Sequence, residues 1–177
     1  PGTFASLELL TSRLGTLASR GDADDEAQAS EAKELLEIAR AVGAGRDPYE
    51  SRTGFMRRAY RSPLDGAPAE YGLYVPRSWA PGRARRWPLV VALHGYDGRP
   101  LAMLRWFFGA DEPQKEQPWE ERHLAGIGDL DAFVLAPSGH GNAMYRDLGE
   151  DDVMSALAHV RELYPIDDAR VTVTGPS

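Results

Sequence analysis

Three short strand-like runs in the second half of the chain constrain its fold more than any other feature of the sequence. Residues 87–93 (WPLVVAL) are continuously apolar, residues 131–136 read DAFVLA, and residues 171–174 read VTVT. Apolar runs of this length are typical of strands that are covered on both faces. Residues 100–108 and 150–164 separate the runs and have helical spacing. This alternation predicts an α/β protein with a mostly parallel sheet.

A β-hairpin is expected ahead of these runs. Residues 55–61 and 69–75 have strand-like patterns, and the segment between them contains two prolines and a glycine. Two strands joined by such a short turn pair antiparallel. We expect this antiparallel pair at the leading edge of the sheet.

The first quarter of the chain has a different pattern. Residues 4–19 and 22–42 have helical spacing, with Asp22 as the expected N-cap of the second helix. We therefore expect a helical segment and linker over residues 1–54, and an α/β domain over residues 55–177. Two helices packed on the side of the domain are the simpler interpretation; a lid or a partner-docking module is the alternative.

The composition of the chain disfavours several classes of binding partner and kinds of site. The chain has 177 residues, 42% hydrophobic and 27% charged, with a net charge of −7, which disfavours nucleic acid and anionic membranes as partners. No apolar run is long enough for a membrane helix, and the lack of cysteine excludes disulfides and thiolate chemistry. No dinucleotide, P-loop or zinc-protease motif occurs, so we expect no cofactor and no metal. The compartment stays open, with a secreted or periplasmic location favoured.

The last residues of the chain contain the most specific motif. Gly175, Pro176 and Ser177 follow the VTVT run directly. A strand that ends in Gly-x-Ser is the first half of a G-x-S-x-G nucleophile elbow, with Ser177 as the nucleophile. Gly175 is expected because the backbone of such an elbow is strained and crowded, so that a side chain at this position would clash. A simple turn is the alternative, because Gly, Pro and Ser are common in turns.

Ligands of parallel sheets bind beyond the carboxyl ends of the strands. We therefore place the site where three loops should converge: residues 94–98, 137–146 and 175–177. In the middle loop, His140, Asn142 and Tyr145 are candidates for binding substrate, and a surface loop with a chance histidine is the alternative. His140 could also be a substitute base, but nothing in the sequence fixes its orientation.

Several segments together resemble the α/β-hydrolase fold, in the branch of polyhydroxybutyrate-depolymerase-like and feruloyl-esterase-like enzymes and prolyl-oligopeptidase-like peptidases. The resemblance covers about residues 55–177 and rests on the order of these segments: residues 58–60, 74–76, 88–95, 136–137, 149–153 and 173–177. It implies a serine hydrolase in which Ser177 attacks a carboxylic ester and forms an acyl-enzyme. It also implies that Gly95 and the backbone N–H of Tyr96 form part of the oxyanion hole. His94 is then expected to fix the turn rather than to act as the base.

The family's order is serine, then acid, then histidine, so both partners of Ser177 are expected downstream or on a second, complementary chain. The chain by itself is therefore expected to be inactive, and the substrate to be a small or polymeric ester. Three explanations would account for the missing acid and histidine. The chain could be one piece of a nicked enzyme, part of a longer chain, or a truncated domain kept for binding. A serine peptidase and a non-catalytic binding domain of hydrolase ancestry remain the alternative functions.

Overall fold

The structure is a computed structural model, and it describes residues 2–19, 25–109 and 128–176. The elements follow each other in the order that the sequence predicts. Their boundaries agree within about three residues, except that the last strand begins at Ile166, well before the run at residues 171–174. They are α1 (Gly2–Ser19), α2 (Asp25–Gly43), β1 (Gly54–Arg61), β2 (Pro68–Val75), β3 (Trp87–Ala92), α3 (Pro100–Phe108), β4 (Phe133–Pro137), α4 (Leu148–Leu163) and β5 (Ile166–Thr174). The α/β class, the hairpin and the N-terminal helical segment are confirmed.

The five strands form one mixed sheet in the order β1-β2-β4-β3-β5. β3 pairs in parallel with β4 and with β5, whereas β2 pairs antiparallel with both β1 and β4. The expectation of a mostly parallel sheet is therefore only partly right, since two of the four pairings are antiparallel. The reason is that the second hairpin strand is inserted beside β4 and has antiparallel neighbours on both sides.

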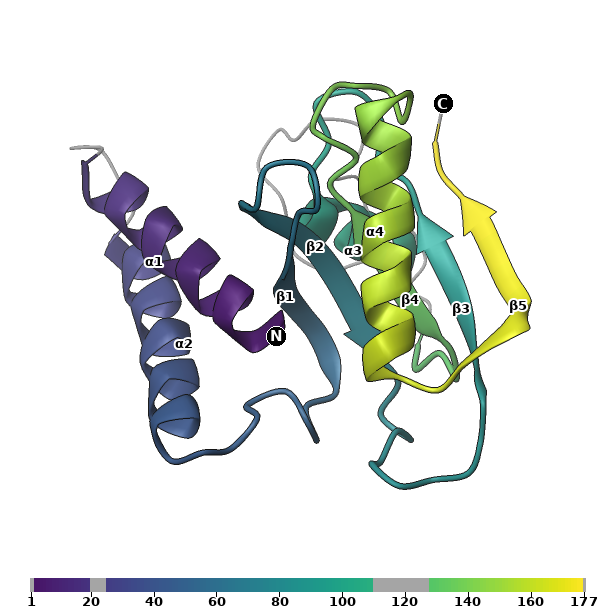
Figure 1. Cartoon of the computed structure of the whole chain (residues 1–177), viewed down its shortest axis with the longest axis horizontal. Coiled ribbons are helices and arrows are strands. Elements are labelled where there is room, and N and C mark those ends of the chain that lie inside the picture. The colour runs from purple at the N-terminus through teal and green to yellow at the C-terminus, as the bar shows by residue number, and fades with distance from the viewer. Residues whose placement is uncertain (1, 20–24, 110–127, 177) are drawn as a thin grey trace.

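Helices cover both faces of the sheet (Figure 1). α1, α2 and α4 supply residues to the core on one face, and α3 packs on the other. Side chains alternate along the strands, so that in β4 Phe133 and Leu135 face the first core while Val134 and Ala136 face the second. This two-sided burial explains why the central strands read as continuous apolar runs.

Two glycines mark the end of the second N-terminal helix. α2 ends at Gly43, and Gly45 takes the left-handed backbone with a φ of 70°. The N–H of Gly45 donates to the carbonyl of Val42 at 2.9 Å, which closes the last turn. The expected N-cap, Asp22, and residues 110–127 lie outside the described residues.

β5 differs from the expectation of a buried strand. It pairs only with β3 among the described strands, and most of its residues are exposed, including Val173 at 63%. The alternation of Val and Thr predicts a strand correctly, but exposure depends on which elements lie beside it. In the described part of the chain β5 is an edge of the sheet.

Candidate active site

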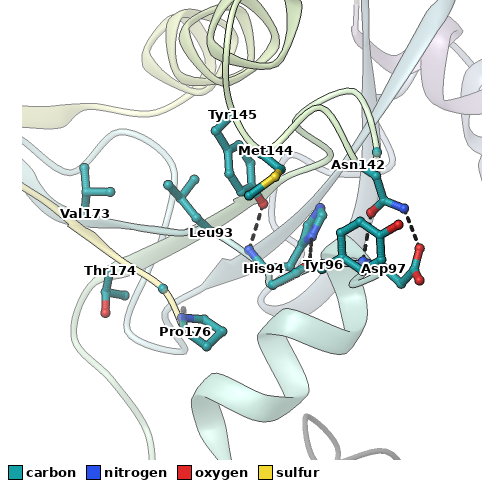
Figure 2. A pocket seen from close by; sticks show the side chains of 13 residues that line it. Leu93, His94, Tyr96, Asp97, Asn142, Met144, Tyr145, Val173, Thr174 and Pro176 are labelled. Carbon is teal, nitrogen blue, oxygen red and sulfur yellow. Dashed lines mark hydrogen bonds between the residues drawn. The ribbon is translucent and has the colours of Figure 1, made fainter.

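A cleft of about 880 Å³ lies at the carboxyl ends of β3, β4 and β5. Its walls come from the three loops that the sequence analysis placed there, shown in Figure 2. The described lining residues are Leu93, His94, Gly95, Tyr96, Asp97, Gly141, Asn142, Met144, Tyr145, Val173, Thr174, Gly175 and Pro176. The expected meeting of the loops is confirmed for these residues, while Ser177 lies outside the described residues.

The end of β5 is pressed against the end of β3. The N–H of Leu93 donates to the carbonyl of Thr174 at 2.8 Å, and the next residue is Gly175. A Cβ atom at Gly175 would lie 2.5 Å from the carbonyl oxygen of Leu93. Because that neighbour is backbone, a side chain at this position would force the two strands apart. The expected steric role of Gly175 is confirmed.

His94 fixes the turn that follows β3. Its ring is buried, with Nδ1 2.8 Å from the carbonyl oxygen of Gly95 and Nε2 2.9 Å from that of Ser138. Both ring nitrogens therefore face backbone carbonyls and neither is turned toward the cleft as a base would be. This geometry agrees with the structural role that the sequence analysis assigned to His94.

Gly95 and Tyr96, the residues expected to contribute to an oxyanion hole, lie in the turn after β3 and line the cleft. The side chain of Tyr96 is 70% exposed, and within the described residues its backbone N–H donates to no acceptor. Among residues 2–19, 25–109 and 128–176, a Cβ atom on Gly95 would come within 4 Å of Pro176 only, at 3.8 Å. The turn after β3 thus faces the segment that leads to Ser177, with the Tyr96 N–H beside it.

Asp97 was not singled out by the sequence analysis, but it connects two loops of the site. Its N–H donates to Oδ1 of Asn142 at 2.8 Å, and the side-chain amide of Asn142 donates to the carboxylate of Asp97. The amide of Asn142 is therefore engaged by protein at both ends. Asn142 lines the cleft as expected, but its contacts are those of a link between loops.

Tyr145 lines the base of the cleft from the same loop. Its hydroxyl oxygen accepts the N–H of His94 at 2.8 Å (Figure 2). Burial raises the pKa of Tyr145 to about 12, an effect partly offset by the hydrogen bond from His94. The hydroxyl therefore keeps its proton at ordinary pH, and within the described residues that proton has no recorded acceptor. Tyr145 therefore stays neutral and keeps a hydrogen-bond donor among the residues that line the cleft.

The middle loop has an anchor that the sequence analysis missed. Asp152, in α4, is buried and accepts the N–H of Gly139 at 2.6 Å. It also accepts the hydroxyl of Tyr60 from β1. Of the three neighbouring acids at residues 150–152, Glu150 and Asp151 lie in the first turn of α4, where negative charge interacts favourably with the helix dipole. The spacing of Asp152 with buried Ala156 and His159 was the signal that it points inward.

His140 does not line the cleft. It is exposed and lies in a neighbouring cavity of about 440 Å³ between the hairpin turn and the middle loop, beside Asp65 and Ser138. The expected binding role of His140 in the cleft is not supported by this placement. The reason is its left-handed backbone, with a φ of 57°, in a loop where successive side chains turn to different sides.

The part of the chain that the structure describes contains no group of three or more histidine, aspartate or glutamate side chains placed to hold a metal ion. Nor does any helix within residues 2–19, 25–109 and 128–176 have the length and apolar character to span a bilayer.

Comparisons with known proteins find similarity in backbone arrangement only. No family model matches the chain, and no curated protein matches it. One similar solved structure is substrate-bound fluorophosphonate-binding serine hydrolase F of Staphylococcus aureus, with a TM-score of 0.46, 13% identity, and coverage of 69% of this chain and 46% of the other. Another is the CE1 ferulic acid esterase of the anaerobic fungus Anaeromyces mucronatus without substrate, with a TM-score of 0.49, 14% identity, and coverage of 73% and 55%. The chain spans about half the length of the solved structures it matches.

Proposed function

We propose that this chain carries the nucleophile and half of the oxyanion hole of a serine hydrolase that acts on carboxylic esters. The observation that carries the proposal is the N–H of Tyr96, which has no acceptor among the described residues and lies in the turn that faces Pro176, the residue bonded to Ser177. Acyl transfer requires a nucleophile and a backbone donor that act on the same carbonyl group.

In the proposed reaction, the hydroxyl of Ser177 attacks the ester carbonyl and gives its proton to a histidine base. The carbonyl oxygen becomes negatively charged and accepts a hydrogen bond from the N–H of Tyr96. Such a donor contributes a factor of roughly 10²–10³ to the rate. Collapse of the intermediate expels the alcohol, which takes the proton from the histidine. Water then attacks the acyl-enzyme by the same route and releases the acid.

The base and its acid are proposed to come from sequence downstream of Ser177 or from a second chain. His94 is occupied by two carbonyls, and His140 lies in the neighbouring cavity, so neither is suited to act as the base. Intact-mass measurement under native and denaturing conditions tests the proposed completing segment. A polypeptide that accompanies the 19.4 kDa chain and continues the elbow supports it.

The central test is covalent labelling of Ser177 with a fluorophosphonate probe, followed by peptide mapping, with Ser177→Ala as control. Labelling at Ser177 that is lost in the control supports the proposal, because the reaction needs both a base and an oxyanion hole. A folded protein that is labelled nowhere contradicts it and favours a binding domain. Hydrolysis of short aryl esters but not of peptide anilides separates the esterase from the peptidase.

A further inference from the structure

The turn that presents Tyr96 contains a backbone strain. The N–H of Gly98 donates to the carbonyl of Gly95 at 3.0 Å, so Tyr96 and Asp97 are the two central residues of a four-residue turn. Asp97 has a φ of 56°, in the left-handed region that glycine usually occupies at this position of a type II turn. A side chain with a Cβ atom is disfavoured there, so an isolated turn of this sequence would prefer another conformation.

Asn142 compensates this strain through two contacts with the same residue. Its carbonyl oxygen accepts the N–H of Asp97 at 2.8 Å, and its NH₂ group donates to the Asp97 carboxylate (Figure 2). The two residues are 45 positions apart in the sequence, so the pair joins the turn after β3 to the loop after β4. A two-point contact fixes both the position and the direction of the Asp97 peptide group.

The loop that holds Asn142 is itself fixed on both sides of that residue. On one side, Asp152 accepts the N–H of Gly139 at 2.6 Å. On the other, the hydroxyl of Tyr145 accepts the N–H of His94 at 2.8 Å. Hydrogen bonds on both sides therefore fix the loop that carries Asn142. The position of Asn142, and through it that of Asp97, does not depend on the conformation of the turn itself.

We propose that Asn142 and Asp97 are positioning residues, which hold the turn so that the N–H of Tyr96 points at the reacting carbonyl. The inference rests on the proposed function, because the orientation of this N–H matters only where an oxyanion forms. A donor placed wrongly by a fraction of an ångström stabilises the transition state less while leaving ground-state binding nearly unchanged.

The first experiment compares fluorophosphonate labelling of the wild-type protein, in its complete active form, with Asn142→Ala. We expect the limiting rate of labelling to fall about tenfold, part of the roughly 10²–10³ that one oxyanion donor supplies. The probe concentration at half-maximal rate should change less than about twofold, since binding itself is retained. A change in that concentration with an unaltered limiting rate would overturn the proposal and make Asn142 a substrate-binding residue.

A double-mutant cycle tests the role of strain. Glycine accepts a φ of 56° without penalty, so Asp97→Gly should hold the turn even without the Asn142 amide. We expect Asp97→Gly/Asn142→Ala to label at least threefold faster than Asn142→Ala alone. Asp147→Gly is the matched control, because Asp147 has a left-handed φ of 48° in the same loop and does not line the cleft. Additive effects of the two substitutions would contradict the proposal.

Amide hydrogen exchange gives a readout that does not depend on activity. Asn142→Ala should speed exchange of the Asp97 N–H at least tenfold, while the amides of β3 exchange as in the wild type. An unchanged exchange rate of the Asp97 N–H would contradict the positioning role of Asn142, whether or not Ser177 reacts. If the wild type is not labelled but the Asp97 N–H exchanges faster in the variant, Asn142 holds the turn and the proposed hydrolase function is rejected.

Discussion

The two ends of the sheet differ in which residues take the left-handed backbone. At the carboxyl end of β3 and β4, five residues other than glycine have a positive φ in the described part of the chain: Asp97, His140, Met144, Tyr145 and Asp147. At the opposite end, the described connections use only glycines for this conformation, namely Gly45, Gly54, Gly82 and Gly109. The first end is strained and the second is not.

This difference shows that tertiary contacts are needed to stabilise an unfavourable backbone conformation at one end of the sheet but not at the other. Glycine adopts a positive φ without support, so the opposite end needs no special contacts. At the carboxyl end, strained residues coincide with the Asp97–Asn142 link, the Tyr145–His94 bond and the Asp152–Gly139 bond. Strain that persists because surrounding contacts over-determine it is concentrated at functional sites.

The largest effect is expected for an added methyl group at the strained end. Gly175→Ala should lower the free energy of unfolding by about 3 kcal/mol, because the new Cβ atom would lie 2.5 Å from the Leu93 carbonyl oxygen. Gly82→Ala has open space and only a φ penalty, which we expect to cost about 1 kcal/mol. Urea unfolding of both variants measures the contrast. Equal losses would show that the ends do not differ in packing.

A second contrast compares two carboxylates. Asp152→Ala removes the acceptor of the Gly139 N–H and of the Tyr60 hydroxyl in a buried site, so stability should fall by about 2 kcal/mol. Asp131, at the opposite end, pairs with Arg85 at 2.6 Å but is exposed. Asp131→Ala should shift the melting temperature by no more than about 2 °C. A larger loss for Asp131→Ala would reverse the comparison.

A third contrast compares the stability of the protein at pH values where His159, in α4, is neutral and where it is protonated. Burial lowers the pKa of His159 below its usual 6.5, and the charge of Arg58 adds to this while Glu162 opposes it. Between the lowered folded value and 6.5 the unfolded state binds more protons, so stability should fall as the pH drops from 7 toward 5. His159→Leu should weaken that fall in melting temperature. An unchanged slope would mean that other groups cause it.

The smallest effect is expected from relieving strain outside the cleft lining. Asp147 has a φ of 48° and its side chain makes no capping hydrogen bond to α4. Asp147→Gly should therefore raise the free energy of unfolding by about 0.5 kcal/mol, since the relief exceeds the entropy that glycine adds to the unfolded chain. Thermal unfolding would show a rise of about 1–2 °C. A clear fall in stability would argue that Asp147 is not strained.

Much of the fold and part of the site could be predicted from the sequence. The apolar runs predicted β3 and β4, and the helical spacing predicted α3 with its observed ends. The strand leading into Gly-Pro-Ser predicted the crowding at Gly175. The occupied amide of Asn142 and the hydrogen bond between Asp152 and Tyr60 could not be predicted, because each depends on a partner distant in the chain.

By itself, the sequence determined which segments are helices and strands and which loops meet at the carboxyl ends, because these depend on local spacing and on the chain order of strands. Only the tertiary structure decided that β2 lies inside the sheet beside β4, that β5 is an exposed edge, and that His140 leaves the cleft. Strand neighbours and loop conformations are set by contacts between residues far apart in sequence. Local spacing carries no information about such contacts.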